Sequence, residues 1–462
     1  MKYFKVSIIA VLLIIMALPA LAQRRHRIVD AKALLTSAKI AINANPPRYD
    51  EAMELLDQVL TDNGPVAEAY FRRGNIKGEF ATKENSDLQK KLDYIKAMAL
   101  DFDSLEYTCG NKDVEKKYRK DCKKFMELAD SVRVYFWRND YQEGINIINN
   151  IENVHSPNYK NATDSASEAQ AFETLKAAAD SSRLYFEMAY VVDPSEYKPL
   201  EGIGVIYDRL KDYEKSAEYF AKAYDVAPDS NRAEISQNIA YAYLQGRDWE
   251  KSITWLKKFS EFMPDDIPTL SNIAIVYNNL QMRDSALAYN KKVLAISPND
   301  AGANYDIGTY YLLESQDINT EATEARKAGN KEEGDKLTAK MNSVLDTALI
   351  YFENAKNFEP DNIDYLEQFA LVALITGKLD KALDGFQKAV EILPTKDNYI
   401  SIGDILVQKQ QFCDAISPYE KALEEDPGDI KLYEVLGDLY ESCKMPEKAE
   451  EARAKAEELK NL

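Results

Sequence analysis

Apolar and small residues recur along this chain at intervals of four and three residues, the spacing that places them on one face of an α-helix. In the stretch DYEKSAEYFAKAYDVAPDS, Ser216, Phe220 and Ala223 stand at these intervals, and Pro228 follows five residues later. Proline lacks the backbone N–H that a helix needs, and it biases the preceding residue away from helix. The pattern therefore predicts an amphipathic helix that ends just before Pro228.

The same pattern returns at regular distances. We call the residue 12 before each proline the small position and the residue 8 before it the large position. The period is about 34 residues, with one insertion that makes the interval from Pro298 to Pro360 nearly twice as long. The recurring prolines are Pro194, Pro228, Pro264, Pro298, Pro360, Pro394 and Pro427.

A second pattern occupies the first half of each unit and predicts a preceding helix. It reads Leu200-x-x-Ile203-Gly204-x-x-Tyr207, and a small residue in mid-helix allows a neighbouring helix to approach closely. The pattern returns as Leu270-x-x-Ile273-Ala274-x-x-Tyr277, Tyr399-x-x-Ile402-Gly403-x-x-Leu406 and Tyr433-x-x-Leu436-Gly437-x-x-Tyr440.

Together these units resemble tetratricopeptide repeats, whose pattern is W-x₂-L-G-x₂-Y…A-x₃-F…P over about 34 residues. The resemblance is continuous from about Tyr197 to Leu462 and is clear again near Asp50–Gly64, although no unit has Trp at the first position. It implies an all-α fold, a right-handed superhelical solenoid of antiparallel helix pairs in which each pair stacks on the next.

The expected organisation has four parts: a signal peptide at 1–22, N-terminal helical repeats at 28–103, degenerate or extended repeats at 104–194, and a repeat array at 195–462 with an insertion around 317–343. Helical spacing continues upstream of Pro194 and of Pro360, which predicts two second helices lengthened toward their N-termini. Glu321–Gly334 is densely charged and interrupted by glycines, and we expect it to be a solvated decoration.

The first residues, MKYFKVSIIAVLLIIMALPALAQRR, have the three parts of a secretory signal peptide. Lys2 and Lys5 are basic, Val6–Leu18 is apolar apart from Ser7, and Ala20-Leu21-Ala22 is a small-x-small cleavage pattern. We expect cleavage after Ala22; an uncleaved anchor is the alternative, but a bilayer core needs about 20 apolar residues. No later segment has that length and character, so the mature protein is expected to be periplasmic or secreted, without a transmembrane segment.

Charge argues against two classes of partner. The net charge is −19, and removal of Lys2 and Lys5 makes it −21. A nucleic-acid or anionic membrane surface needs a basic face, so the sequence predicts neither partner.

The chain has four cysteines, and in an exported protein they could form disulfides, because disulfides persist in oxidising compartments. Cys109 and Cys122 are near neighbours in sequence, and Cys413 and Cys443 are separated by a little less than one repeat. Two disulfides and four buried thiols are both compatible with this spacing. Neither pair has C-x-x-C spacing and the chain has only 2 histidines, so no metal site is predicted.

No constellation for catalysis is found. The glycines are spread along the helices rather than gathered in a phosphate-binding loop, and no paired His and carboxylate spacing occurs. We therefore expect a protein that is not an enzyme and binds no cofactor.

The resemblance instead implies a binding groove lined by the first helix of each pair. The residue just before the Leu-like packing residue is polar in five units, as Asn238, Asn272, Asp306, Gln368 and Ser401, and the first four of these are the candidate groove residues. An amide offers a donor and an acceptor, so such a column could hold the backbone of an extended peptide, as the asparagine ladder of O-linked N-acetylglucosamine transferase does. The simpler interpretation is polarity toward water. Tyr241 and Ile275 belong to an apolar column beside it.

The leading hypothesis is an exported scaffold or adaptor that binds partner proteins or peptides in an envelope assembly or secretion complex. A periplasmic chaperone for extended client segments is the alternative, and a carbohydrate-active enzyme subunit is a further one. The Lys/Asn carboxylate clamp of cytosolic co-chaperones would place Asn where Val205, Tyr241 and Ile275 stand, so recognition of acidic C-terminal tails is not expected.

Overall fold

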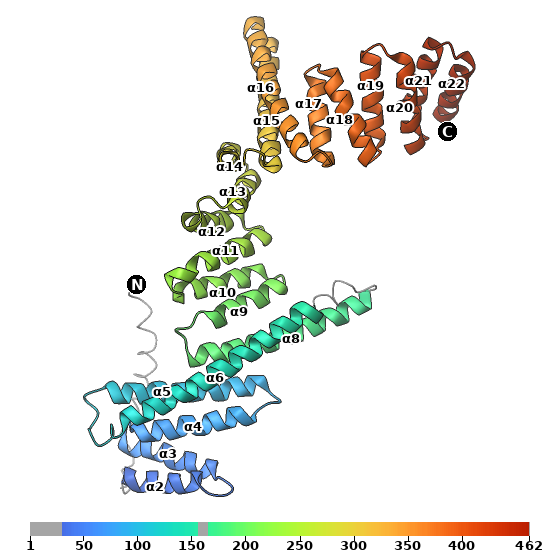
Figure 1. Cartoon of the computed structure of the whole chain (residues 1–462). Coiled ribbons are helices and arrows are strands. Elements are labelled where there is room, and N and C mark those ends of the chain that lie inside the picture. Colours follow the sequence, from blue (N-terminus) through green and yellow to red (C-terminus); the bar gives the residue numbers. More distant parts are fainter. Residues whose placement is uncertain (1–29, 156–164, 462) are drawn as a thin grey trace. The chain divides into compact units, whose positions relative to one another are not determined.

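The computed structural model describes residues 30–155 and 165–461, in which the chain forms twenty α-helices, one short π-helix and no strand (Figure 1). The predicted signal peptide and its cleavage point lie outside the described residues. The described chain is an all-α solenoid of helix pairs, as the repeat pattern predicts.

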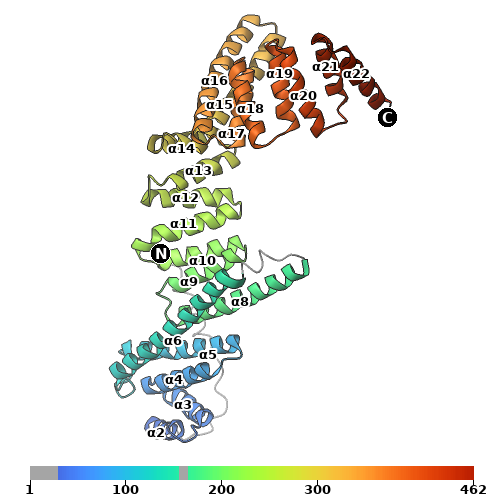
Figure 2. The same ribbon diagram turned by 45° about the vertical axis from the view of Figure 1, so that its right-hand side comes forward.

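The chain divides into two compact units, of which the first runs to Ile235. Consecutive helices pack in antiparallel pairs, and α6 and α8 form one long pair (Figure 2). The helices of this unit are α2 (Ala31–Ile42), α3 (Tyr49–Asn63), α4 (Ala67–Lys83), α5 (Leu88–Gly110), α6 (Cys122–Asn150), the π-helix η2 (Ile151–His155), α8 (Ser165–Val192), α9 (Lys198–Arg209), α10 (Tyr213–Val226) and the start of α11 (Asp229–Gln245).

The second unit begins at Ser236, inside α11. Its further helices are α12 (Trp249–Phe262), α13 (Ile267–Asn279), α14 (Arg283–Ile296), α15 (Ala301–Lys327), α16 (Lys331–Phe358), α17 (Ile363–Ile375), α18 (Leu379–Ile392), α19 (Lys396–Gln408), α20 (Phe412–Glu425), α21 (Ile430–Ser442) and α22 (Pro446–Lys460). From α13 onward each first helix pairs with the helix that follows it.

The recurring prolines end the second helices as predicted. Each of these helices stops two residues before its proline; the end residues are Val192, Val226, Phe262, Ile296, Phe358, Ile392 and Glu425. In several units an Asp or Asn two residues after the proline then caps the next first helix. Asp266 and Asp300 do so by accepting a hydrogen bond from a backbone N–H three residues on.

From the α9–α10 pair onward, the turn inside each pair passes through one residue with positive φ. Gly329 (φ 83°) and Gly377 (φ 73°) take this conformation without steric cost. Elsewhere a residue with a side chain adopts it, with φ between 58° and 62°: Lys211, Arg247, Gln281, Gln410 and Lys444. One left-handed residue thus reverses the chain in each of these repeats.

The small residue in the middle of the first helix contacts the large position of the second helix. A Cβ added at Gly204 would lie 2.8 Å from Cδ1 of Phe220. A Cβ added at Gly403 would lie 2.6 Å from Cζ of Tyr419. The first helix therefore lacks a side chain where the ring of the second helix packs, which is the close approach that the sequence predicts.

Both long pairs differ from the prediction in one respect. The second helices α8 and α16 are lengthened toward their N-termini, as expected, but the first helices α6 and α15 are lengthened as well. In the second unit, α15 continues to Lys327 with Ile318 and Ala322 buried against the pair. The expectation that Glu321–Gly334 is a solvated decoration is therefore confirmed in part: most of its residues are exposed, but Ala322 and Gly334 are packed.

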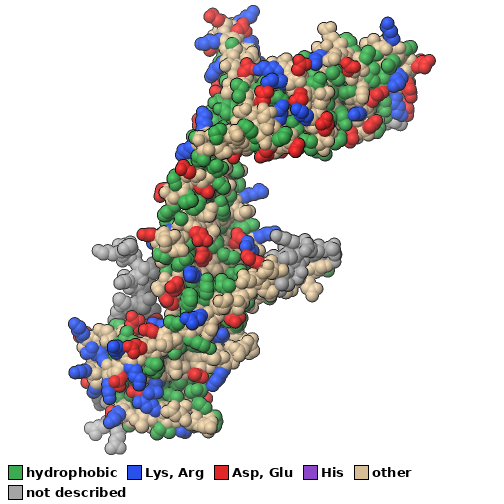
Figure 3. Space-filling view, viewed as in Figure 1, with side chains coloured by type: hydrophobic (Ala, Val, Ile, Leu, Met, Phe, Trp, Pro, Cys, Tyr) green, Lys and Arg blue, Asp and Glu red, His purple; other side chains and the backbone are tan. Residues whose placement is uncertain are grey.

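Charged side chains gather at the free end of the α15–α16 pair (Figure 3). Arg326 closes this end by donating to the carbonyl of Gly334 at 3.1 Å and to Thr338 Oγ1 at 2.6 Å. In the first unit, the expected boundary between residues 103 and 104 would fall inside α5.

Candidate functional site

The predicted polar column occupies the same position in four first helices of the second unit. Asn238 lies on α11, Asn272 on α13, Asp306 on α15 and Gln368 on α17, and all four are half-buried. Asn238, Asn272 and Gln368 have no side-chain hydrogen-bond partner among the described residues. Their amides are therefore free to donate to and accept from a bound chain.

The neighbouring column lies three residues further along the same helices. Ile275 is 45% exposed, a large exposure for an isoleucine in a repeat, and Leu371 is 40% exposed. Tyr241 is half-buried and its hydroxyl accepts a hydrogen bond from Gln237 Nε2 at 3.3 Å. Apolar surface thus accompanies the free amides.

A hollow of about 970 Å³ opens between the end of α13, the start of α14 and the middle of α15. We call it the α13–α15 hollow. Asp306 of the predicted column lines it, whereas Asn238, Asn272, Gln368, Tyr241 and Ile275 do not. Of the predicted groove residues, Asp306 therefore lines this hollow, and the others lie on their helices outside it.

Two side chains that the sequence analysis did not single out define the chemistry of this hollow. Asn290 of α14 is 3% exposed, and its Nδ2 donates to Asp306 Oδ2 at 3.2 Å. Burial raises the pKa of Asp306, and the hydrogen bond from Asn290 partly offsets this. Tyr310 donates from its hydroxyl to Asp284 Oδ1 at 2.8 Å, and this bond, together with burial, raises the pKa of Tyr310 to about 12.

A signal for Asn290 was present in the sequence. It occupies the large position of its unit, eight residues before Pro298. In the other units that position holds Phe186, Phe220, Leu256, Phe352, Phe386 or Tyr419. A polar residue where the repeat otherwise buries a large apolar side chain marks a local departure from packing.

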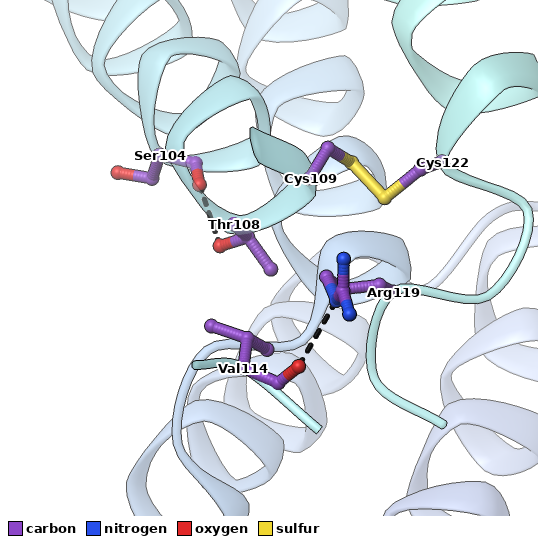
Figure 4. Close-up of a disulfide and its surroundings, with 6 residues drawn as sticks. All are labelled: Ser104, Thr108, Cys109, Val114, Arg119 and Cys122. Carbon is purple, nitrogen blue, oxygen red and sulfur yellow. Dashed lines mark hydrogen bonds between the residues drawn. A yellow bond between two sulfur atoms is a disulfide. The ribbon is translucent and has the colours of Figure 1, made fainter. Parts of the chain in front are cut away.

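Both cysteine pairs are disulfides in the structure. Cys109 at the end of α5 joins Cys122 at the start of α6, with their Cα atoms 5.6 Å apart (Figure 4). Cys413 in the first turn of α20 joins Cys443, which caps the C-terminus of α21. The open choice between disulfides and thiols is thus resolved as two disulfides.

Neither a metal site nor a membrane span is found in the described part of the chain. No group of three or more His, Cys, Asp or Glu side chains there is arranged to hold a metal ion. No helix within residues 30–155 and 165–461 is both long and apolar enough to cross a bilayer.

The family model for the tetratricopeptide repeat matches residues 198–230, which are α9, α10 and the start of α11. This match places residues 198–230 in the tetratricopeptide-repeat class, and the described chain has the all-α solenoid fold of helix pairs that is typical of that class. The fold implies a scaffold for protein–protein interaction, and proteins of this class bind peptides or proteins and are in general not enzymes.

Solved structures of similar fold were found, whereas no curated protein matches the chain. The crystal structure of YrrB, a tetratricopeptide-repeat protein with an unusual peptide-binding site, is 21% identical, with 44% of this chain and 91% of YrrB covered and a TM-score of 0.35. TTC0263, a thermophilic tetratricopeptide-repeat protein in Thermus thermophilus, is 19% identical, with 45% and 98% covered and a TM-score of 0.27. A monomeric IFIT1 mutant with Gppp-AAAA is 16% identical, with 94% and 91% covered and a TM-score of 0.33.

Proposed function

We propose that the chain is an exported scaffold that binds partner proteins through the first helices of its second unit. The observation that carries the proposal is the repeated, half-buried amide without a hydrogen-bond partner at Asn238, Asn272 and Gln368. A half-buried amide without a protein partner loses little when it exchanges water for the backbone of a bound segment. Ile275 and Leu371 add apolar surface beside these amides.

Export is supported by two independent features. The N-terminal sequence has the charged, apolar and small-x-small parts of a signal peptide. Both cysteine pairs are joined as disulfides, which persist in secreted and periplasmic proteins and are rare in the cytosol. An envelope assembly or secretion complex is a setting in which an exported scaffold of this kind would act.

The test is capture of partners by the full chain, tagged at its C-terminus and expressed in its native host, after brief cross-linking. The scaffold proposal predicts a few partners at fixed ratio to the chain. Many unrelated exported proteins, each at low occupancy, would instead indicate a chaperone for extended segments.

The amide column is tested by the double variant Asn238→Ala and Asn272→Ala. Loss of two hydrogen bonds to a bound backbone should lower partner affinity by about tenfold or more, with no change in the thermal midpoint. The matched control is Asn319→Ala with Asn342→Ala, two exposed asparagines of α15 and α16. Equal capture by both double variants would rule out the column as the binding surface.

A further inference from the structure

We propose that the α13–α15 hollow accepts a lysine or arginine side chain of the bound partner. This inference rests on the proposed binding function and specifies the partner's chemistry at one point of the surface. It begins from Asn290, which takes the place that a large apolar residue fills in the other units. Asn290 instead lines the hollow with an amide, which bonds to Asp306 of α15.

The hollow contains acceptor atoms without partners. The amide nitrogen of Asn290 is bonded to Asp306 Oδ2, but no described residue donates to Asn290 Oδ1 or to the second carboxylate oxygen of Asp306. Glu314, which also lines the hollow, has no ion-pair or hydrogen-bond partner for its carboxylate among the described residues. A carbonyl oxygen on an almost fully buried side chain, without a donor, favours a ligand that supplies one.

The net charge of the lining residues favours a positively charged ligand. The lining contains four carboxylates and a single guanidinium, so its net charge is negative. The guanidinium of Arg283 is already paired with Asp317 at 2.9 Å. Lysine and arginine carry donors and no acceptor, which matches unpartnered acceptors and negative charge together.

The hollow also has apolar surface and enough volume for the aliphatic stem of a lysine or arginine side chain. Leu287 and Leu313 line it, and the aliphatic stem of lysine or arginine packs on apolar surface while its charged end stays among polar groups. The ring of Tyr310 also lines the hollow and offers a face to a cation. A volume of about 970 Å³ accommodates a side chain together with the backbone that carries it.

The probe is a set of fluorescein-labelled twelve-residue peptides of alternating Gly and Ser, identical except for one central residue, which is Lys, Arg, norleucine or Glu. Binding to the full mature chain is measured by fluorescence anisotropy at low and at physiological salt. We expect the Lys and Arg peptides to bind about tenfold more tightly than the norleucine peptide, and the Glu peptide to bind most weakly.

The decisive variant is Asn290→Phe, which restores the large residue of the other units and replaces the amide that lines the hollow with an apolar ring. The α17–α18 pair already buries Ala370 together with Phe386, so a phenylalanine opposite Ala274 has a precedent in this chain. The variant should retain or raise the thermal midpoint and reduce the preference for Lys over norleucine to about one. Asp306→Asn changes shape little and should weaken Lys binding about fivefold or more, and Glu321→Gln, an exposed site on the same helix, is its control.

The outcomes separate this inference from the proposed function. If the Lys preference persists in Asn290→Phe and Asp306→Asn, the basic peptides are attracted by the net charge of −21 of the mature chain in general, and the inference is overturned while partner capture stands. If the Lys preference is absent in the wild type, the inference is also overturned. Failure of the proposed function shows itself differently, as partner capture that is unaffected by Asn238→Ala with Asn272→Ala.

Discussion

Gly308 of α15 allows the ring of Phe352 in α16 to pack closely against its backbone. A Cβ added there would lie 2.9 Å from Cδ1 of Phe352, a ring with 0% exposure that has no space to retreat. We expect Gly308→Ala to lower the free energy of unfolding by about 1–3 kcal/mol, because overpacking outweighs a gain in helix propensity of about 1 kcal/mol. Urea unfolding followed by circular dichroism measures the change.

The matched control lies in the same helix. The atom nearest to a Cβ added at Gly302 is Asp300 Oδ1, at 3.5 Å, and the residue is exposed. Gly302→Ala should leave stability unchanged or slightly higher. A similar loss in both variants would show that the ring contact at Gly308 is not what requires glycine.

Asp140 of α6 is a buried carboxylate with incomplete pairing. It is 2% exposed, Lys91 Nζ lies 3.1 Å from its Oδ1, and its Oδ2 has no hydrogen-bond partner within the described chain. Burial raises the pKa of Asp140 to about 6, against the opposing effect of Lys91. In the unfolded chain an aspartate has a pKa of about 3.9. The folded protein therefore binds a proton at Asp140 more tightly than the unfolded chain does.

The pH dependence of stability follows from that difference. The favourable contribution of protonated Asp140 is fully present below about pH 4 and is lost as pH rises through about 6, a change of about 3 kcal/mol for two pKa units. Asp140→Asn removes this titration. The free energy of unfolding of the variant minus that of the wild type should therefore increase between pH 4.5 and pH 7, measured by urea unfolding at each pH. A difference that stays constant over this range would contradict the assignment.

The sequence predicted residues whose role is set within one helix pair and missed those whose role depends on a contact between pairs. Phe220 and Gly204 are found by spacing alone, because their partners lie at fixed offsets in the same unit. The bond between Asn290 and Asp306 joins the second helix of one pair to the first helix of the next, and no offset rule specifies it. Asp140 lies in a segment whose repeat register the spacing leaves ambiguous, so its burial could not be predicted.

At the scale of elements, the disulfide between Cys413 and Cys443 ties the start of α20 to the end of α21. Cys413→Ser with Cys443→Ser should destabilise this region by about 3–4 kcal/mol, the chain-entropy value for a loop of this length. Repeats contact only their neighbours, so the loss should stay local. Hydrogen exchange should accelerate in α20, α21 and α22 and remain unchanged in α9 and α10.

The other disulfide provides the reciprocal control. Cys109→Ser with Cys122→Ser should accelerate exchange at the end of α5 and the start of α6 and leave α20–α22 protected. Uniform acceleration along the chain in either double variant would mean that the repeats unfold as one cooperative unit.

The long α15–α16 pair shows which helix boundary could not be predicted from the sequence. The upstream extension of α16 carries apolar residues at helical spacing and was predicted. The extension of α15 over Glu321–Lys327 buries only Ala322, in a run of charged side chains, so no apolar stripe marks it. Its helix is stabilised by its partner in the pair, which composition alone does not reveal.

At the scale of the whole molecule, each repeat leaves an apolar face that its neighbour covers, and this explains why the same pattern recurs so often along the chain. The repetition gives a series of equivalent positions along the first helices. The binding surface that we propose uses these first-helix positions together with one departure on a second helix, Asn290 of α14, rather than a separate loop or domain. The fold is therefore evident from the repeat, whereas the binding surface that we propose depends on the exceptions to it.

The proposed export makes a prediction about the chain's own N-terminus. In the native host the mature protein should begin at Gln23, outside the cytoplasm, with both disulfides formed; intact mass and peptide mapping without reductant measure all three. Ala22→Arg places a large charged residue at the cleavage site and should leave the uncleaved form, whereas Leu21→Val, at the tolerant position between the two alanines, should be processed normally. A wild-type chain that retains residues 1–22 and has oxidised cysteines would instead identify an N-terminal anchor, and reduced cysteines in a cytoplasmic chain would contradict export altogether.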